Sequence, residues 1–338
     1  MTTIGILGGG QLGRMLAMAA ARLGMRAHVL DPGEAPVASE VAAFTRASWD
    51  DAESVAAFAK ACSVVTYEFE NVPAAALDAV EPWAPVRPGR RALEVSQDRI
   101  HEKAFLEGIG LRVAPYTAVD DPDALARAVA ALGTPAILKT RRLGYDGRGQ
   151  ARIDAPDDLP VVEAPSVLEG VVPFEREVSV IAARGLDGSV VAYDPGENVH
   201  EGGILRRTTV PAAIPPALRQ DAVLIAGRIL NALDYVGVIG VELFVGRDGL
   251  VVNEIAPRVH NSGHWTEAAC VVDQFEQHVR AVAGWPLGDG RRHSDAVMEN
   301  LIGGVPPSFD PAAKVHLYGK SPRPGRKLGH VTRLGGRA

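Results

Sequence analysis

Cysteine is scarce in this chain, which has Cys62 and Cys270 among its 338 residues and no others. Two cysteines that far apart form neither a disulfide framework nor a zinc-binding spacing, and they suit a reducing cytoplasm. The sequence also lacks an uncharged run long enough to span a bilayer, and its first residues lack the basic region of a signal peptide. We therefore expect a cytoplasmic protein with no membrane partner.

An excess of positive charge is absent as well, because the formal net charge is −6. Such a chain offers no general electrostatic attraction for nucleic acid, so an anionic substrate would need a local basic pocket. Hydrophobic residues make up 47% of the chain and charged residues 22%, which is typical of a globular protein. The length indicates two or three domains.

Glycine is abundant near the N-terminus, where Gly8, Gly10 and Gly13 form a G-x-G-x-x-G pattern. The pattern follows a predicted strand and opens a predicted helix. Asp31 ends the next predicted strand, near the distance expected for a ribose-binding carboxylate, so an NAD-dependent oxidoreductase is one interpretation. The alternative is a tight strand-to-helix turn whose N–H groups face some other anion. The pattern alone leaves both open.

Strands and helices alternate up to about residue 70, which predicts a small parallel sheet covered on both faces. A segment rich in proline and arginine, Glu81–Arg90, is a predicted linker. The next predicted helix has Ser96 as its cap and Asp98 in its first turn, and it ends near Gly108. Further on, two hairpins indicate antiparallel sheet, and a long helix is predicted over 266–284. The chain should therefore open as α/β and continue as α+β, unlike a two-domain dehydrogenase.

The second hairpin carries the strongest local signal. If Arg247, Asp248 and Gly249 form a three-residue loop, Glu242 faces Glu254 across the two strands. Two carboxylates opposed on an apolar sheet repel each other, and a divalent cation such as Mg²⁺ resolves the conflict. One alternative is a pair of solvated acids on an edge strand. A two-residue loop would place the acids on opposite faces and remove the argument.

A basic, glycine-rich segment follows a predicted strand that ends near Lys139. Between residues 140 and 150, three glycines and three arginines are interspersed, so backbone N–H groups and positive charge would surround phosphate groups. The same glycines would let the segment close over a nucleotide as a lid. The alternative is an exposed basic hairpin. Together with the acid pair, the segment indicates a magnesium–nucleotide site.

Three further segments carry polar groups near these motifs. Glu169 ends a predicted strand and Glu177 begins the next, which suits an adenosine but also fits an ordinary surface turn. Residues 258–264, just beyond the second acid of the hairpin, include one arginine, two histidines and an asparagine. A basic C-terminal tail would suit a phosphate monoester, although such tails are more often merely solvated.

These segments resemble the ATP-grasp superfamily, and within it the 5-(carboxyamino)imidazole ribonucleotide synthetases of purine biosynthesis. The resemblance runs nearly end to end and is carried by GGGQLGRML, TYEFENV, QDRIHEKAFL, GYDGRGQ, ENVHEGGIL, NEIAPRVHNSGHW and RPGRKLGH. It implies an ATP-grasp fold preceded by a Rossmann-like domain. It also implies that ATP phosphorylates bicarbonate to carboxyphosphate, and that aminoimidazole ribonucleotide takes up the carboxyl group. A sister ligase such as formate-dependent glycinamide ribonucleotide formyltransferase is the alternative.

The resemblance assigns roles to individual residues, including Mg²⁺, with Mn²⁺ as an alternative, at Glu242 and Glu254. The residues implied at ATP are Arg99, Lys139, Gly144, Tyr145, Asp146, Gly147, Arg148, Gly149, Gln150, Glu169, Gly170, Val171, Val172, Glu177, His200, Asn253 and Glu254, with Lys103 nearby. Within this set, 144–150 would form the lid and 169–172 would hold the adenine. The residues implied in catalysis are Arg258, His260, Asn261 and Lys320. The residues implied at the ribonucleotide are Glu70, Tyr145, Arg148, Lys320, Arg326 and Lys327.

The resemblance also implies a division of the chain. Residues 1–95 would form the Rossmann-like domain, 96–166 a small ATP-grasp subdomain with the lid, and 167–285 a large subdomain with the nucleotide and metal site. Residues 286–338 would form a C-terminal region with a basic substrate-binding tail. The same resemblance implies a homodimer, no NAD at the glycine turn, and small-molecule ligands: ATP, bicarbonate and aminoimidazole ribonucleotide.

Overall fold

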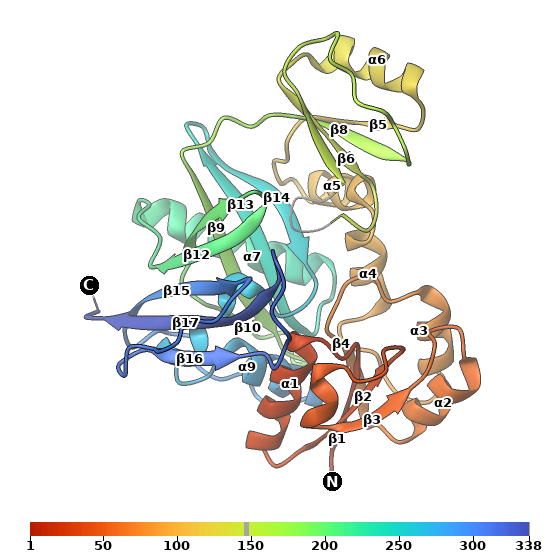
Figure 1. The fold of residues 1–338 in the computed structure, drawn as a ribbon, viewed down its shortest axis with the longest axis vertical. Helices are drawn as coiled ribbons and strands as arrows, with labels where there is room; N and C mark the ends of the chain where they lie inside the picture. Colours follow the sequence, from red (N-terminus) through yellow and green to blue (C-terminus); the bar gives the residue numbers. More distant parts are fainter. Residues whose placement is uncertain (145–148, 338) are drawn as a thin grey trace.

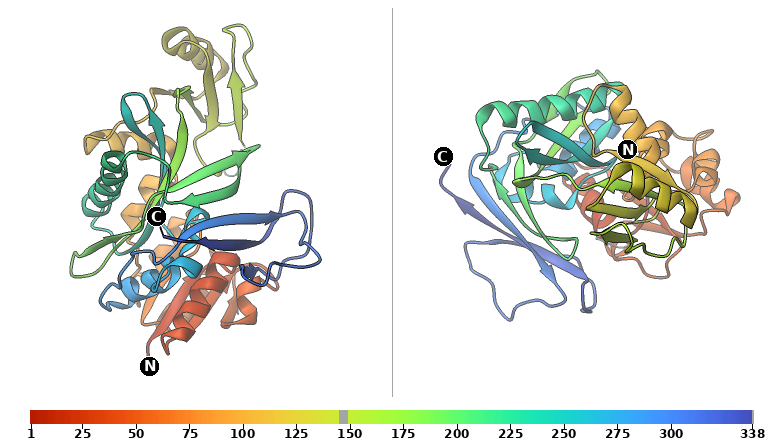
Figure 2. Two further views of the ribbon diagram at one scale, coloured as in Figure 1. Left: turned by 90° about the vertical axis from the view of Figure 1, so that its left-hand side faces the viewer. Right: turned by 90° about the horizontal axis from the view of Figure 1, so that it is seen from above.

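Three sheets organise the molecule, and the computed structural model describes residues 1–144 and 149–337 (Figure 1). The N-terminal sheet and the small sheet lie at opposite ends of the long axis, with the large sheet between them (Figures 1 and 2). The change from parallel to antiparallel pairing along the chain agrees with the prediction.

The N-terminal sheet is parallel, with the strand order β3-β2-β1-β4. Its strands are β1 (Thr3–Leu7), β2 (Arg26–Asp31), β3 (Ala43–Arg46) and β4 (Val64–Tyr67). Side chains alternate between its faces, so Ile4 and Ile6 pack with α1 (Gln11–Arg22), whereas Leu7 packs with α2 (Ala52–Lys60) and α3 (Ala74–Val80). A short 3₁₀ helix, Val37–Glu40, precedes β3. The predicted two-sided cover is confirmed, although β3 was not predicted.

Two helices, α4 (Arg90–Ser96) and α5 (Arg99–Gly108), lead from this sheet to the small one. The predicted cap at Ser96 is wrong, because Ser96 ends α4. Asp98 caps α5 instead, with its side chain accepting a hydrogen bond from the Ile100 N–H at 3.0 Å.

The small sheet is antiparallel and has the order β5-β8-β6-β7. Its strands are β5 (Tyr116–Val119), β6 (Ala136–Thr140), β7 (Gln150–Ile153) and β8 (Ser166–Gly170). Helix α6 (Pro122–Leu132) packs on this sheet through Leu125 and Val129.

The large sheet has nine strands in the order β14-β13-β9-β11-β12-β15-β17-β16, and β10 pairs with β9 at one end. The strands are β9 (Arg176–Arg184), β10 (Val190–Ala192), β11 (Gly196–Glu201), β12 (Ile204–Val210), β13 (Gly237–Gly246), β14 (Gly249–Ala256), β15 (Asp295–Ile302), β16 (Lys314–Leu317) and β17 (Lys327–Gly335). One apolar face packs on α7 (Pro216–Ala232), and the other packs on α9 (Gln274–Ala283), which also contacts α1.

Two predictions for the C-terminal part are wrong. The helix expected over 266–284 is divided into α8 (Thr266–Ala269) and α9, because Asp273 leaves the helical path and caps α9 by accepting two backbone N–H bonds. The expected basic tail is instead a loop followed by β17, which lies inside the large sheet with Leu328 and His330 buried. Within the described ranges, no helix combines the length and the apolar character needed to cross a membrane.

Candidate active site

The acids Glu242 and Glu254 pair across the β13–β14 hairpin, as predicted. The turn that joins the strands differs from the prediction. It has two residues, Arg247 and Asp248, and Gly249 already belongs to β14, where its φ of +102° suits glycine. A two-residue turn by itself would send the two acids to opposite faces of the sheet.

A β-bulge restores the pairing of the acids. Leu243 pairs with Val252, whereas its neighbour Glu242 pairs with Glu254, so Asn253 is the extra residue on β14. The bulge shifts the remainder of β14 by one residue and returns Glu254 to the face of Glu242. The bulge in β14, and not the predicted three-residue turn, therefore places the two acids opposite each other.

The surroundings of the two acids act on their pKa values in opposite directions. Burial, reinforced by the charge of Glu254, raises the pKa of Glu242. Burial also opposes ionisation of Glu254, but Arg99 and Lys139 outweigh it and lower the pKa of that carboxyl. Two opposed carboxylates whose repulsion a hard dication would relieve form a donor set that fits Mg²⁺.

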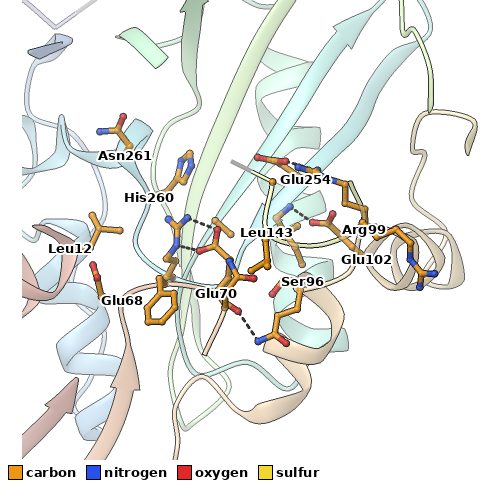
Figure 3. A pocket seen from close by; sticks show the side chains of 18 of the residues that line it. Leu12, Glu68, Glu70, Ser96, Arg99, Glu102, Leu143, Glu254, His260 and Asn261 are labelled. Carbon is orange, nitrogen blue, oxygen red and sulfur yellow. Dashed lines mark hydrogen bonds and ion pairs between the residues drawn. The ribbon is translucent and has the colours of Figure 1, made fainter. Parts of the chain in front are cut away.

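Two adjoining cavities meet at this hairpin. The hairpin cavity has a volume of about 350 Å³ and lies between β6 and β7 of the small sheet and β9, β11, β13 and β14 of the large sheet. The junction cavity has a volume of about 430 Å³ and lies where the residues after β4, helix α5 and the residues after β14 meet (Figure 3). The residues that line both cavities are Arg99, Glu254, His260, Asn261 and Lys327.

The hairpin cavity combines charged groups with an apolar wall. His200 Nδ1 lies 2.6 Å from Glu177 Oε2. Burial lowers the pKa of His200, but the interaction of its ring with the Glu177 carboxylate and the charge of Glu242 raise it overall. Phe174 and Phe244 stack at 4.6 Å between ring centroids beside these groups. This aromatic pair could not be predicted from the sequence, because its members are far apart in the chain.

The predicted adenine segment 169–172 does not contribute to the lining of either cavity in the described ranges. Glu169 is instead paired with Lys139 Nζ at 2.9 Å and Lys103 Nζ at 3.3 Å. The backbone N–H groups of Gly170 and Val171 donate to carbonyl groups outside the segment. The buried carboxylate of Glu169 therefore holds two lysines in place, and Lys139 lines the hairpin cavity.

The junction cavity is organised by a partly buried ion pair between segments far apart in the chain. Arg258 donates from Nε to Glu70 Oε2 at 2.5 Å and from Nη2 to Glu70 Oε1 at 3.0 Å. This two-bond geometry fixes the planes of both groups, and the two bonds are drawn as dashed lines at Glu70 in Figure 3. Asn261 exchanges hydrogen bonds with the Asn300 amide at 2.9 and 2.7 Å, which fixes the orientation of its side chain.

Two titratable groups on this wall are held neutral. Burial and the Arg258 charge lower the pKa of His260 to about 3. Burial and the Glu254 charge raise the pKa of Glu102 to about 8. Glu102 accepts the Ile255 N–H at 2.6 Å, next to Glu254 in the chain. Glu102 was not predicted from the sequence, because its role depends on contacts with β14.

The glycine turn is occupied by side chains of the protein itself. Glu68 accepts hydrogen bonds from the N–H groups of Gly10 at 2.8 Å and Gly13 at 3.2 Å. Asp31 accepts the Gly9 N–H at 2.8 Å. These are the donors that a dinucleotide pyrophosphate would need, so the structure gives Asp31 a local role in the turn. Glu68 was not singled out from the sequence, although it lies within TYEFENV.

Among the remaining predicted residues, Lys327, Gly144, Gly149, Gln150 and Asn253 line one or both cavities. Lys320 is outside the lining but donates a hydrogen bond to Gln11, which belongs to the junction cavity. Arg326 donates to the Ser321 carbonyl group and is also outside the lining. Tyr145, Asp146, Gly147 and Arg148 lie outside the described residues.

Family models match three successive parts of the chain. A ribonucleotide synthetase preATP-grasp domain matches residues 1–97, and an ATP-grasp domain matches residues 104–275. A phosphoribosylaminoimidazole carboxylase C-terminal domain matches residues 296–338. The matched parts include the glycine turn, the acid pair and the loop that carries Lys320.

Known proteins of one kind match almost the full length. The N5-carboxyaminoimidazole ribonucleotide synthase of Brucella melitensis is 54% identical, over 98% of this chain and 96% of that protein. A solved structure of the synthetase from Thermus thermophilus is 44% identical, with a TM-score of 0.92 over 98% of this chain and 93% of that one. The Aspergillus clavatus enzyme, solved with ADP and 5-aminoimidazole ribonucleotide, is 33% identical, with a TM-score of 0.92 over 99% and 94%. This chain therefore belongs to the N5-carboxyaminoimidazole ribonucleotide synthase family of ATP-grasp ligases.

Proposed function

We propose that this enzyme uses ATP to activate bicarbonate as carboxyphosphate and transfers the carboxyl group to the exocyclic amine of 5-aminoimidazole ribonucleotide, a step of purine biosynthesis. The observation that carries the proposal is the position of Glu254. It belongs to an opposed acid pair and lies on the wall shared by two cavities. One cavity would hold ATP and the other the ribonucleotide, so the two half-reactions would meet at this residue.

The hairpin cavity has the groups that a nucleotide requires. Phe174 and Phe244 would pack against the base, Glu177 would bind ribose hydroxyls, and Lys139 and Arg99 would neutralise the phosphates. Glu242 and Glu254 would hold Mg²⁺. When bound, the ion would neutralise charge on the transferred phosphoryl group and orient it.

Positioning and charge would drive the first half-reaction. A bicarbonate oxygen attacks the γ-phosphorus of ATP, the bond to the β–γ bridging oxygen breaks, and ADP leaves with that oxygen. Arg258 and neutral His260 would face the bicarbonate, with Arg258 fixed by Glu70. Enclosure of the site would limit hydrolysis of the carboxyphosphate.

In the second half-reaction, the amine nitrogen forms a bond to the carbon of carboxyphosphate, and the bond from that carbon to the phosphate oxygen breaks. The amine proton leaves with phosphate. Lys320, Arg326 and Lys327 would bind the phosphate of the ribonucleotide, an arrangement supported by the contact of Lys320 with Gln11 on the cavity wall.

ADP release with and without 5-aminoimidazole ribonucleotide, in bicarbonate buffer, tests the proposal. We expect release to depend on both substrates, with ¹³C from labelled bicarbonate recovered as a carbamate on the ribonucleotide. Formate in place of bicarbonate should not support turnover. Formate-dependent ADP release on glycinamide ribonucleotide would instead identify a sister ligase and defeat the proposal.

Three further assignments belong to this proposal. The functional units are residues 1–95, 96–166, 167–285 and 286–338; the separate family matches over 1–97, 104–275 and 296–338 support the first and last boundaries, whereas the boundary between 166 and 167 falls within one match. The enzyme acts as a homodimer. It works in the cytoplasm, where its unpaired cysteines Cys62 and Cys270 would stay reduced. Light scattering tests the dimer, and mass analysis of trapped thiols tests the redox state.

A further inference from the structure

Two histidines and a glutamate that the proposed reaction does not use meet at the C-terminal hairpin. His316 on β16 and His330 on β17 are directly opposed across the strands. His316 Nδ1 lies 3.2 Å and His330 Nε2 lies 3.1 Å from the same atom, Oε2 of Glu267 on α8. One ligand atom from each residue falls within 4.8 Å of the others. The side chain of His316 is 11% exposed, that of His330 is 1% exposed and that of Glu267 is 14% exposed.

His330 has a hydrogen-bond partner on its second ring nitrogen, as metal-binding histidines usually have. Tyr318 Oη lies 2.9 Å from His330 Nδ1, the ring nitrogen that points away from Glu267. An outer partner on the second nitrogen fixes both the tautomer and the orientation of a metal-binding histidine. The fully buried ring of His264 stacks on His330 at 4.6 Å between centroids, and its Nε2 has no hydrogen-bond partner among the described residues. Burying three imidazole groups together is costly unless a ligand or a hydrogen-bond network satisfies them.

We propose that Glu267, His316 and His330 form a binding site for a divalent transition metal such as Zn²⁺. Two imidazole groups and one carboxylate are a common donor set for this ion, and three protein ligands leave a position for water. Bonds of about 2.0–2.2 Å at tetrahedral angles separate neighbouring ligand atoms by about 3.3–3.6 Å. The two contacts with Glu267, at 3.1 and 3.2 Å, would open slightly to admit the ion, and the three ligand atoms, which lie within 4.8 Å of one another, would close to the same range.

Metal binding would change the tautomers in a defined way. The ion would take the lone pairs of His316 Nδ1 and His330 Nε2, so each ring would carry its proton on the other nitrogen. His330 would then donate from Nδ1 to Tyr318 Oη. The ion would connect α8 to β16 and β17, and so would fix the base of the loop that carries Lys320 and Arg326.

Addition of Zn²⁺ to metal-free full-length protein tests this site. The measurements use a Glu254→Gln background, so that the acid pair of the hairpin does not compete for the ion. We expect one equivalent of Zn²⁺ in competition with a chromophoric chelator and a rise in Tm. Glu267→Gln and His316→Gln should each weaken binding at least tenfold and abolish the Tm rise. The exposed His293→Gln should change neither.

Co²⁺ gives a measurement that does not depend on folding of the ligand variants. The parent protein should show the visible absorption of a four- or five-coordinate Co²⁺ site, and Zn²⁺ should displace it. Absence of one-equivalent binding, or affinity unchanged in His316→Gln, would overturn the proposal. The cluster would then be a hydrogen-bond network only, with Glu267 accepting from both rings.

Discussion

Arg99 Nη1 lies 3.0 Å from Glu254 Oε2, while the same carboxylate faces Glu242 across the hairpin. The Arg99 guanidinium thus neutralises Glu254 on one side. A second cation, between the acids, would be needed to relieve the repulsion between Glu254 and Glu242. Binding of Mg²⁺ would let Arg99 exchange its carboxylate partner for an ATP phosphate. Under the proposed function, this arrangement would link nucleotide binding to the charge state of the pair.

Glu254→Gln should lower the rate of ADP release by about 10²–10³-fold. The amide keeps the shape of the side chain but weakens the proposed metal site. The variant should remain folded with a modestly lowered Tm, because the charge that Arg99 and Lys139 stabilise is lost, while the removed repulsion with Glu242 offsets part of that loss. Steady-state ADP release and thermal denaturation measure the two effects. Glu94→Gln on the exposed face of α4 is the control, and normal turnover by Glu254→Gln would contradict the assignment.

Arg258→Lys should lower kcat/KM by about 10–10²-fold, because lysine cannot reproduce the two parallel bonds to Glu70. Glu70→Gln should have a similar effect. In the double variant, the stability changes should be non-additive by about 0.5–3 kcal/mol, since the two groups act as one unit. Urea denaturation of all four proteins gives the coupling energy, and simple additivity would show that the pair does not act together.

Glu68→Ala should destabilise the protein by about 1–3 kcal/mol, because the N–H groups of Gly10 and Gly13 would lose their acceptor. Urea unfolding measures the change. Glu68→Gln retains an amide oxygen and should recover part of the loss. Equal stability of Glu68→Ala and the parent would mean that water replaces the carboxylate without cost.

NADH should leave the Tm unchanged, whereas ATP with Mg²⁺ should raise it. A ligand stabilises a protein only by binding its native state, by about 2.7 kcal/mol at a hundred times its Kd. Glu68 and Asp31 already occupy the N–H groups of the glycine turn. A Tm rise with NADH alone would restore the oxidoreductase interpretation.

His278 should make the protein less stable in acid. Burial lowers the pKa of its imidazole to about 3 in the folded protein. Its Nδ1 accepts the Val238 N–H at 3.1 Å, so the neutral ring donates from Nε2 to Thr66 Oγ1 at 2.7 Å. The unfolded chain takes up the proton first, so this contribution to stability is complete above about pH 6.5 and is lost as the pH falls toward 3.

The expected slope from this one group is about 1.4 kcal/mol per pH unit within that range. Urea unfolding at pH 7 and pH 5 measures it. His278→Gln should be less stable at pH 7 but should show a shallower fall between the two values. An unchanged slope would assign the acid sensitivity to other groups.

The sequence predicted those parts of the fold that depend on local periodicity. The strand, glycine turn and helix at the N-terminus, the hairpins and the opposed acids are all confirmed. Local patterns did not identify the helix caps at Asp98 and Asp273. Ser96 lies two residues before Asp98 and is an equally suitable cap residue, and the apolar pattern of 266–284 runs through Asp273 without a break. They also misjudged the C-terminal region, because the two strands there gain their stability from pairing with each other and with the sheet.

The least predictable parts of the site depend on contacts between distant segments. Glu68 contacts a turn 58 residues earlier in the chain, and Glu102 contacts β14 153 residues later. No spacing rule identifies such partners. Nothing in the segments TYEFENV and QDRIHEK shows whether a given carboxylate contacts a ligand or another part of the protein. Only the fold distinguishes the two cases.

The extra residue at Asn253 has a consequence for how this protein tolerates change in length. Deletion of Asn253 would leave a regular hairpin in which Glu254 is the next residue after Val252 and still pairs with Glu242, so the opposed acids would remain. What the deletion would remove is the local bend and extra twist that a bulge gives a strand. The extra residue therefore sets the direction in which the end of β14 runs past the two cavities, in addition to setting which residue Glu242 faces.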